Sequence, residues 1–159
     1  MATQSRSPIH ECLAAERRAV GSLVTLLRSE QGCLSQASVL ALSNLTPEKA
    51  ALVADVSELT RQRHRALADA GYAPDDLGMR AWLNSPAGRP SDKAWAETLD
   101  LLRSAQELNR VNGLLIGQQL SRSQRLFNAL QSAVRPAALY GRNGRTASGA
   151  AVSRGLSVG

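Results

Sequence analysis

The longest regular pattern of apolar residues lies between Lys93 and Pro136 and predicts a single helix. At 1.5 Å per residue, a helix from Lys93 to Arg135 would be about 65 Å long. We expect its apolar stripe to be longer than the rest of the chain can cover, which would leave its C-terminal part for a partner. Apolar residues recur there at spacings typical of one helical face: Leu102, Leu108, Leu115, Ile116, Leu120, Phe127, Leu130 and Val134.

Two shorter helices are predicted before it. Ser7 followed by Pro8 is a typical helix start, with the serine as N-cap. Gly32 is expected to weaken or end this first helix, with residues 34–44 as a short extension. Its apolar residues recur every seven positions, as in a coiled-coil seam: Leu13, Val20, Leu27 and Leu34.

The second helix is predicted to begin with Thr46 as N-cap and Pro47 in the first turn. Gly71 is expected to cap its C-terminus. Residues 72–92 contain three prolines and two glycines and predict a long connection. Within it, a short helical turn from Met79 to Leu83 would place Trp82 against the bundle.

Composition agrees with an all-α fold, because only 3% of the residues are aromatic and no stretch shows sustained strand alternation. We expect an antiparallel three-helix bundle or coiled coil with a long third helix and a flexible C-terminal tail. The predicted helical-bundle domain covers residues 1–136. Residues 137–159 have few large apolar groups and are expected to form a disordered tail.

Two functional alternatives exist to a protein that binds a partner through its apolar stripe, and the formal net charge of +6 suggests the first of them. Arg142, Arg145 and Arg154 follow Pro136 without any acidic residue, which would suit a small basic nucleic-acid-binding protein. In the rest of the chain, however, arginines alternate with acidic residues, as on a solvated helix face. A helical scaffold that self-associates through the apolar stripe is the other alternative.

No feature predicts a membrane or secreted protein. No apolar run approaches the roughly 20 residues that span a bilayer, and the N-terminus lacks a signal-peptide core. Cys12 and Cys33 are 21 positions apart on one predicted helix, about 30 Å, and are too distant to pair within it. We therefore expect a reduced, cytoplasmic protein.

The sequence predicts neither an enzyme nor a cofactor or metal site. His10 and His64 are the only histidines, and neither belongs to a metal-binding pattern on a helix. His10 and Cys12 are not expected to share a metal ion, because they are two positions apart on a helix and their side chains point in different directions.

Asn109, Asn112 and Gly113 are unusual within a helix, since asparagine and glycine both lower its stability. Gln106 and the two asparagines fall on one side of the helix. One interpretation is that the amides fix the register of the helix seam while Gly113 admits a close-packed neighbour. The other is a polar notch that a partner recognises.

Four strings of residues, in this order, give the chain a resemblance to a known family: LTPEKAAL, WAETLDLLRSAQE, NRVNGLLI and LYGRNGRT. The chain resembles the FlgN family of bacterial flagellar export chaperones from about Ile9 to Thr146. This resemblance implies an antiparallel helical bundle without enzymatic activity. It also implies binding to the C-terminal helical ends of the hook-associated proteins FlgK and FlgL.

The resemblance also implies roles for individual residues. The client surface would comprise Leu120, Phe127, Leu130 and Val134, together with the tail. Tyr140 would match the residue that docks on the export-gate protein FlhA. Arg142 and Asn143 stand where the family usually has proline and an acidic residue after the Tyr-Gly pair.

Overall fold

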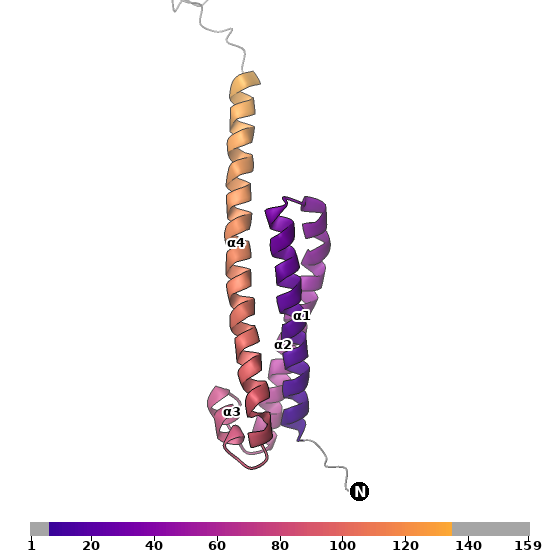
Figure 1. Cartoon of the computed structure of the whole chain (residues 1–159), viewed down its shortest axis with the longest axis vertical. Helices are drawn as coiled ribbons and strands as arrows, with labels where there is room; N and C mark the ends of the chain where they lie inside the picture. Colours follow the sequence, from indigo (N-terminus) through magenta and orange to yellow (C-terminus); the bar gives the residue numbers. More distant parts are fainter. Residues whose placement is uncertain (1–6, 135–159) are drawn as a thin grey trace, which may run out of the picture. The chain divides into compact units, whose positions relative to one another are not determined.

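The computed structural model describes residues 7–134, apart from the side chains of Val39 and Val134. Their secondary structure is entirely helical and contains no strand (Figure 1). The all-α prediction is therefore confirmed for these residues. The helices are α1 (Pro8–Ser35), α2 (Val39–Asp69), α3 (Asp76–Leu83), the 3-10 helix η1 (Arg89–Ser91) and α4 (Asp92–Val134).

The chain divides into two compact units, Met1–Gln119 and Leu120–Gly159, which we call unit 1 and unit 2. Unit 1 contains α1, α2, α3 and most of α4, and the described part of unit 2 is the C-terminal portion of α4. The predicted domain boundary at residues 136 and 137, and the predicted tail, lie outside the described residues.

The predicted seam of the first helix is confirmed, since all four of its heptad residues are buried: Leu13, Val20, Leu27 and Leu34. Gly32 does not end the helix, which continues to Ser35. Ala37 takes a positive φ of 53° in the connection and redirects the chain into α2. The helix therefore ends where the backbone leaves the right-handed helical region rather than at its glycine.

The predicted start of the second helix was wrong. α2 begins at Val39, eight residues before Pro47, which lies inside the helix. Thr46 is not an N-cap, because its hydroxyl donates to the carbonyl of Leu42 (3.1 Å). Pro47 has no N–H to donate to the carbonyl of Ser43, four residues earlier in the helix. Ser43 is exposed, so water can hydrogen-bond to this carbonyl instead.

This extension changes the helix lengths on which the sequence argument rested. α1 has 28 residues and α2 has 31, so both are longer than helices that end near Gly32 or begin at Thr46. α4 has 43 residues, so it remains the longest helix but is less than twice the length of the others.

α1 and α2 run in opposite directions. Glu16 pairs with Arg63, whereas Glu30, later in α1, pairs with Lys49, earlier in α2. The first of these pairs is buried, and its N–O distance is 2.7 Å. Charged groups thus fix the register of this hairpin alongside its apolar seam.

The connection after α2 agrees with its prediction. Gly71 takes a positive φ of 83° directly after the C-cap of α2. The predicted short turn is the helix α3, and Trp82 is buried as expected. Gly78 and Gly88 lie against backbone atoms of Ala73 and Trp82, where an added Cβ would approach to 1.8 and 2.1 Å. Side chains other than glycine are therefore excluded at both positions.

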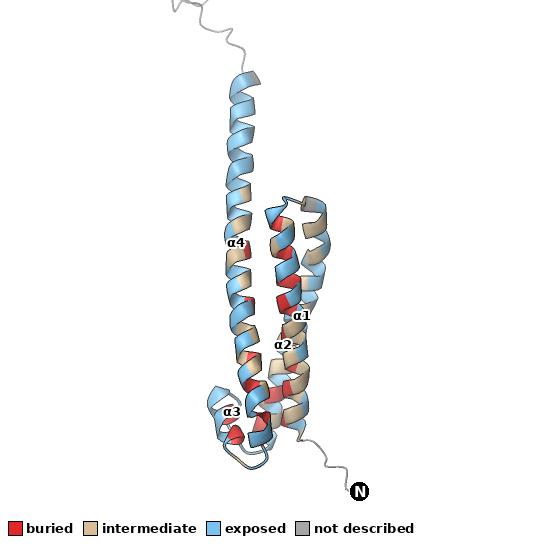
Figure 2. Cartoon of the chain, viewed as in Figure 1, coloured by how far each residue is buried: buried red, intermediate tan, exposed pale blue. Residues whose placement is uncertain are grey.

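The buried residues of unit 1 form two apolar clusters along α1 (Figure 2). The first joins the start of α1 to α2, α3 and α4: Ile9, Leu13, Leu67, Met79, Trp82, Leu83 and Trp95. The second lies further along α1 and includes one α4 residue: Leu23, Val24, Leu27 and Ala105. Within unit 1, α4 therefore packs against α1 along a buried stripe.

Candidate functional site

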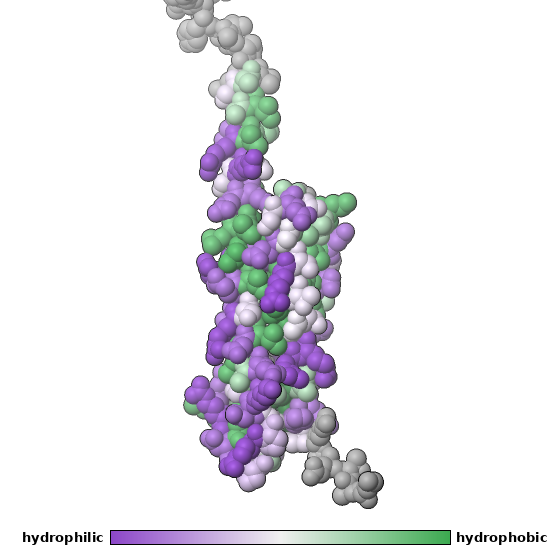
Figure 3. Space-filling model, in the orientation of Figure 1, coloured by the Kyte–Doolittle hydropathy of each residue, from purple (hydrophilic) through white to green (hydrophobic). Residues whose placement is uncertain are grey.

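Four large apolar side chains are exposed on the described part of unit 2. Figure 2 colours this part of α4 as exposed, and Figure 3 shows hydrophobic surface on it. Their exposed fractions range from 55% for Phe127 to 69% for Leu120. Every residue from 120 to 133 is exposed. We call this set the apolar arc: Leu120, Leu126, Phe127 and Leu130.

The apolar arc occupies one side of its helix. At about 100° per residue, its four residues span an arc of about 120°, with Leu126 and Leu120 at the two borders. Ser123 is the polar residue within this span. An apolar face of this width normally packs against a core or a partner helix. The arc therefore has the shape of an amphipathic docking surface.

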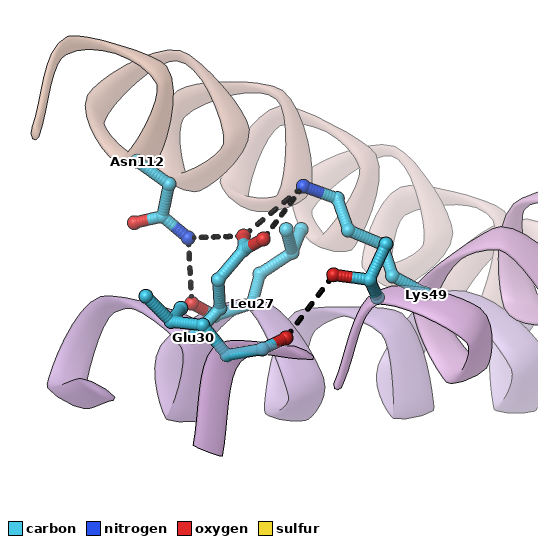
Figure 4. Close-up of polar contacts among 6 residues, drawn as sticks. Leu27, Glu30, Lys49 and Asn112 are labelled. Carbon is cyan, nitrogen blue, oxygen red and sulfur yellow. Dashed lines mark hydrogen bonds and ion pairs between the residues drawn. The ribbon is translucent and has the colours of Figure 1, made fainter. Parts of the chain in front are cut away.

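A buried polar cluster joins α4 to α1 in unit 1 (Figure 4). The Nδ2 of Asn112 donates to the carbonyl of Leu27 (2.9 Å) and to Glu30 Oε2 (2.7 Å). Lys49 of α2 donates to both carboxylate oxygens of Glu30 at 3.0 and 3.1 Å. The carboxylate of Glu30 therefore links all three helices at one level.

The comparison with known families decides what kind of protein carries these features. The family model described as FlgN protein matches residues 1–148, which is nearly the whole chain. The chain belongs to the FlgN family. No curated protein and no solved structure matches it. The resemblance drawn from the four sequence strings is thus confirmed at the level of the family, which is one of flagellar export chaperones.

In this FlgN-family chain, the structure separates the three amides that the sequence grouped together. Asn112 is buried in the cluster with Glu30, whereas Gln106 and Asn109 are exposed. Asn112 therefore makes contacts of the kind that would fix helix register. An added Cβ at Gly113 would have no atom of another helix within 4 Å, so the structure shows no close-packed neighbouring helix there.

Gln106 and Asn109 line an open pocket formed by α1, α2 and α4 within unit 1. Lys49 is the charged residue of this pocket. Its apolar lining comes from all three helices: Leu23, Leu27, Val53, Leu102 and Ala105. The two exposed amides thus lie beside an apolar depression, where a partner side chain can reach them.

Two of the residues suggested by the resemblance have no described side chain. Val134 is the last residue of α4, and nothing is described of its side chain. Tyr140 lies outside the described residues. Leu120, Phe127 and Leu130 are placed together on the apolar arc, and their role in client binding stays a prediction.

Residues 7–134 contain no cluster of three or more metal-ligating side chains, and no helix among them is long and apolar enough to cross a membrane. His10 makes a 2.8 Å hydrogen bond with Ser91, the last residue of η1. Cys12 and Cys33 are both free thiols on α1. Burial, together with the nearby carboxylates of Glu11 and Glu16, raises the pKa of Cys12 and keeps it protonated.

Sequence reasoning missed part of this arrangement. Leu126 was not included in the predicted stripe, although it lies four residues before Leu130 and forms a border of the arc. Glu16 and Glu30 were not recognised as buried. The sequence contained a signal for their burial, since each glutamate follows a buried leucine of the first-helix seam by three residues and so lies on the same side of the helix.

Proposed function

We propose that this protein is a cytoplasmic flagellar export chaperone that binds the C-terminal amphipathic helices of the hook-associated proteins FlgK and FlgL. By covering the apolar faces of these helices, it prevents their premature assembly, and it then delivers them to the export gate. Membership of the FlgN family supports the chaperone role. The apolar arc is the observation that supports helix binding, because it presents four large exposed apolar side chains on one side of a helix.

The structure of unit 1 suits a scaffold for such a surface. We infer that α1, α2 and α4 form an antiparallel three-helix bundle there. The opposite directions of α1 and α2 support this inference, as do the contacts of Asn112 with α1. A rigid scaffold without catalytic chemistry is sufficient for the proposed role, which requires neither a nucleotide nor another cofactor.

The size of the apolar arc favours a client that is released again. Burying an exposed leucine or phenylalanine fully contributes about 1.5 to 3 kcal/mol, and these side chains are already partly covered. Association and the ordering of side chains oppose this gain by several kcal/mol. The arc alone therefore supports moderate affinity, as a chaperone that must pass its client to an export gate requires.

The test is a binding measurement with the C-terminal segments of FlgK and FlgL. Changing Phe127 and Leu130 together to Asp should abolish binding, because both carboxylates would lie against the apolar face of the client. Helicity by circular dichroism should be retained, since both positions are exposed. Unchanged affinity for the client would show that the arc is not its binding site.

A matched control uses exposed leucines of unit 1. Leu40 of α2 and Leu77 of α3 are at least as exposed as the arc residues, so the double change to Asp alters charge and apolar surface equally. This control should bind both client segments as the unaltered protein does. A similar loss in the control would indicate a general effect of added negative charge.

Two other functions remain to be separated by experiment. The pI of 10.3 favours nucleic-acid binding, which would weaken steeply as salt is raised. Burial of an apolar helix depends far less on salt. Self-association through the apolar arc would appear in light scattering, and a client peptide should replace such contacts if the arc binds clients.

A further inference from the structure

The charge of the chain is divided sharply along its length. Residues 1–107 carry 12 basic and 13 acidic residues, whereas residues 108–159 carry seven arginines and no acidic residue. The positive net charge of the protein therefore comes entirely from the part of the chain that includes unit 2. Any partner that binds the apolar arc meets a helix with cationic but no anionic side chains.

One of these arginines lies beside a border of the arc. Arg122 precedes Leu126 by four residues, which places it about 40° beyond that border, whereas Arg125 lies about 100° beyond it, on the side of the helix opposite the arc. Both arginines are exposed. The guanidinium group of Arg122 can therefore reach a partner that covers the arc.

The opposite border is uncharged. Gln124 follows Leu120 by four residues and Gln131 follows Phe127 by four, so both amides lie just beyond the Leu120 border. Both are exposed. The apolar arc is thus flanked by the cation of Arg122 on one side and by amides on the other.

The arginines of α4 in unit 1 are paired within the helix, in contrast to Arg122 and Arg125 of unit 2. Arg103 contacts Asp100 at 2.5 Å, and Arg110 contacts Glu107 at 2.7 Å. Arg110 holds the pKa of the Glu107 carboxyl below its usual range by hydrogen bonding. Arg122 and Arg125 make no ion pair with any described residue, and no acidic residue follows Glu107 in the chain.

We propose that the apolar arc binds an amphipathic helix that carries carboxylates along one border of its own apolar stripe. This proposal rests on the proposed function and names the chemistry of the client. Carboxylates of the client would face Arg122, and its uncharged polar side chains would face the amide border. The one-sided charge fixes the orientation in which the client helix is accepted.

Charge disfavours the two other occupants. A second copy of the chain would bring two acid-free helices together and place arginines against arginines. An anionic lipid surface would attract cations on both borders of the arc, whereas only one border carries them. A helix with carboxylates on one side matches the observed distribution.

The experiment compares binding of the C-terminal segments of FlgK and FlgL at about 50 mM and about 500 mM NaCl. In full-length protein, Arg122→Glu should weaken binding about fivefold at low salt, because attraction becomes repulsion at this position. Arg122→Gln should have an intermediate effect. Salt should weaken binding by the unaltered protein and strengthen binding by the Arg122→Glu variant.

The control is Arg125→Glu, an exposed position on the side of the same helix opposite the arc, which changes the net charge equally. It should bind as the unaltered protein does. A client segment whose acidic residues along one border are changed to lysine should bind the Arg122→Glu variant better than the unaltered protein.

The outcomes separate the two proposals. Equal binding by the Arg122→Glu variant and the unaltered protein would overturn the charged-border inference and leave the chaperone function in place. If the unaltered protein bound neither segment, the proposed function would be overturned, and the inference with it. Arginine-dependent binding to phosphatidylglycerol vesicles, or arginine-independent self-association, would assign the arc to a membrane or to a second copy and overturn the inference.

Discussion

Asn112 on α4 donates a hydrogen bond to the backbone carbonyl of Leu27 on α1 at 2.9 Å. The same nitrogen donates to Glu30, one turn later on α1 (Figure 4). A main-chain carbonyl within a helix is an acceptor at a fixed position, so this contact sets how far α4 is shifted along α1. A polar residue within a seam specifies register in this way at some expense of stability.

Replacing Asn112 tests this role. Asn112→Ala should lower the free energy of unfolding by about 1 to 3 kcal/mol, because Glu30 loses a buried donor. Asn112→Asp should lower it further at neutral pH, since a second carboxylate would then face Glu30. The like charge and burial would raise the pKa of the new aspartate, so the difference between the two variants should shrink as the pH falls. Urea unfolding at pH 7 and at about pH 4.5 measures this difference.

The buried pair of Glu16 and Arg63 provides a second prediction. The side chain of Arg63 also stacks on Trp95, 4.8 Å from the ring centroid, so it joins α1, α2 and α4. Arg63→Ala should destabilise unit 1 by about 3 to 5 kcal/mol, because it leaves a buried carboxylate without its partner.

A double variant separates the contribution of the charge pair from that of the contact between Arg63 and Trp95. Glu16→Met together with Arg63→Met removes both charges while retaining much of the buried volume. It should be markedly more stable than Arg63→Ala in chemical unfolding. If the double variant were as unstable as the single one, the contact between Arg63 and Trp95, rather than the charge pair, would dominate.

The start of α2 shows where local sequence signals fail. Thr46 and Pro47 match the N-cap and first-turn preferences closely, yet the helix continues through both. Leu52, five residues after Pro47, packs against the second apolar cluster, and Leu45, two residues before it, is partly buried. Tertiary burial along the hairpin can outweigh a capping preference of about 1 kcal/mol.

Substitutions at these two positions report which start is correct. Pro47→Ala should stabilise the protein by about 1 to 3 kcal/mol, because it restores an internal N–H and removes a steric conflict in the helix interior. Thr46→Ala should change stability by less than about 0.5 kcal/mol, since the side chain is exposed. If Thr46 were the N-cap, its loss would instead cost about 1 kcal/mol. Thermal unfolding measures both effects.

Most features that the sequence predicted correctly came from regular patterns of apolar residues or from local backbone preferences. The heptad of α1, the length of α4, the burial of Trp82 and the turn at Gly71 all follow from local periodicity or backbone preference. The partners of Asn112 and Arg63 do not, because they lie 85 and 47 positions away in the chain. Which polar groups meet across a seam depends on the relative shift of the helices, and that shift is a tertiary property.

The apolar arc was only partly predictable from the sequence. Sequence periodicity located Leu120, Phe127 and Leu130, but it could not distinguish an exposed stripe from a buried one. The argument from helix length favoured exposure, although it used an α2 that was too short. The burial pattern now gives the direct observation, since residues 120–133 are all exposed.

Tyr140 provides the last prediction, which concerns delivery rather than client binding. The resemblance to the FlgN family assigns this residue to docking on the export-gate protein FlhA, whereas the apolar arc is proposed for the client. Tyr140→Ala should therefore weaken binding to the cytoplasmic domain of FlhA and leave binding to the FlgK and FlgL segments unchanged. Tyr140→Phe, which keeps the ring, separates the contribution of the ring from that of the hydroxyl. Equal loss of both interactions in the alanine variant would contradict two separate sites, because the apolar arc proposed for the client does not contain Tyr140.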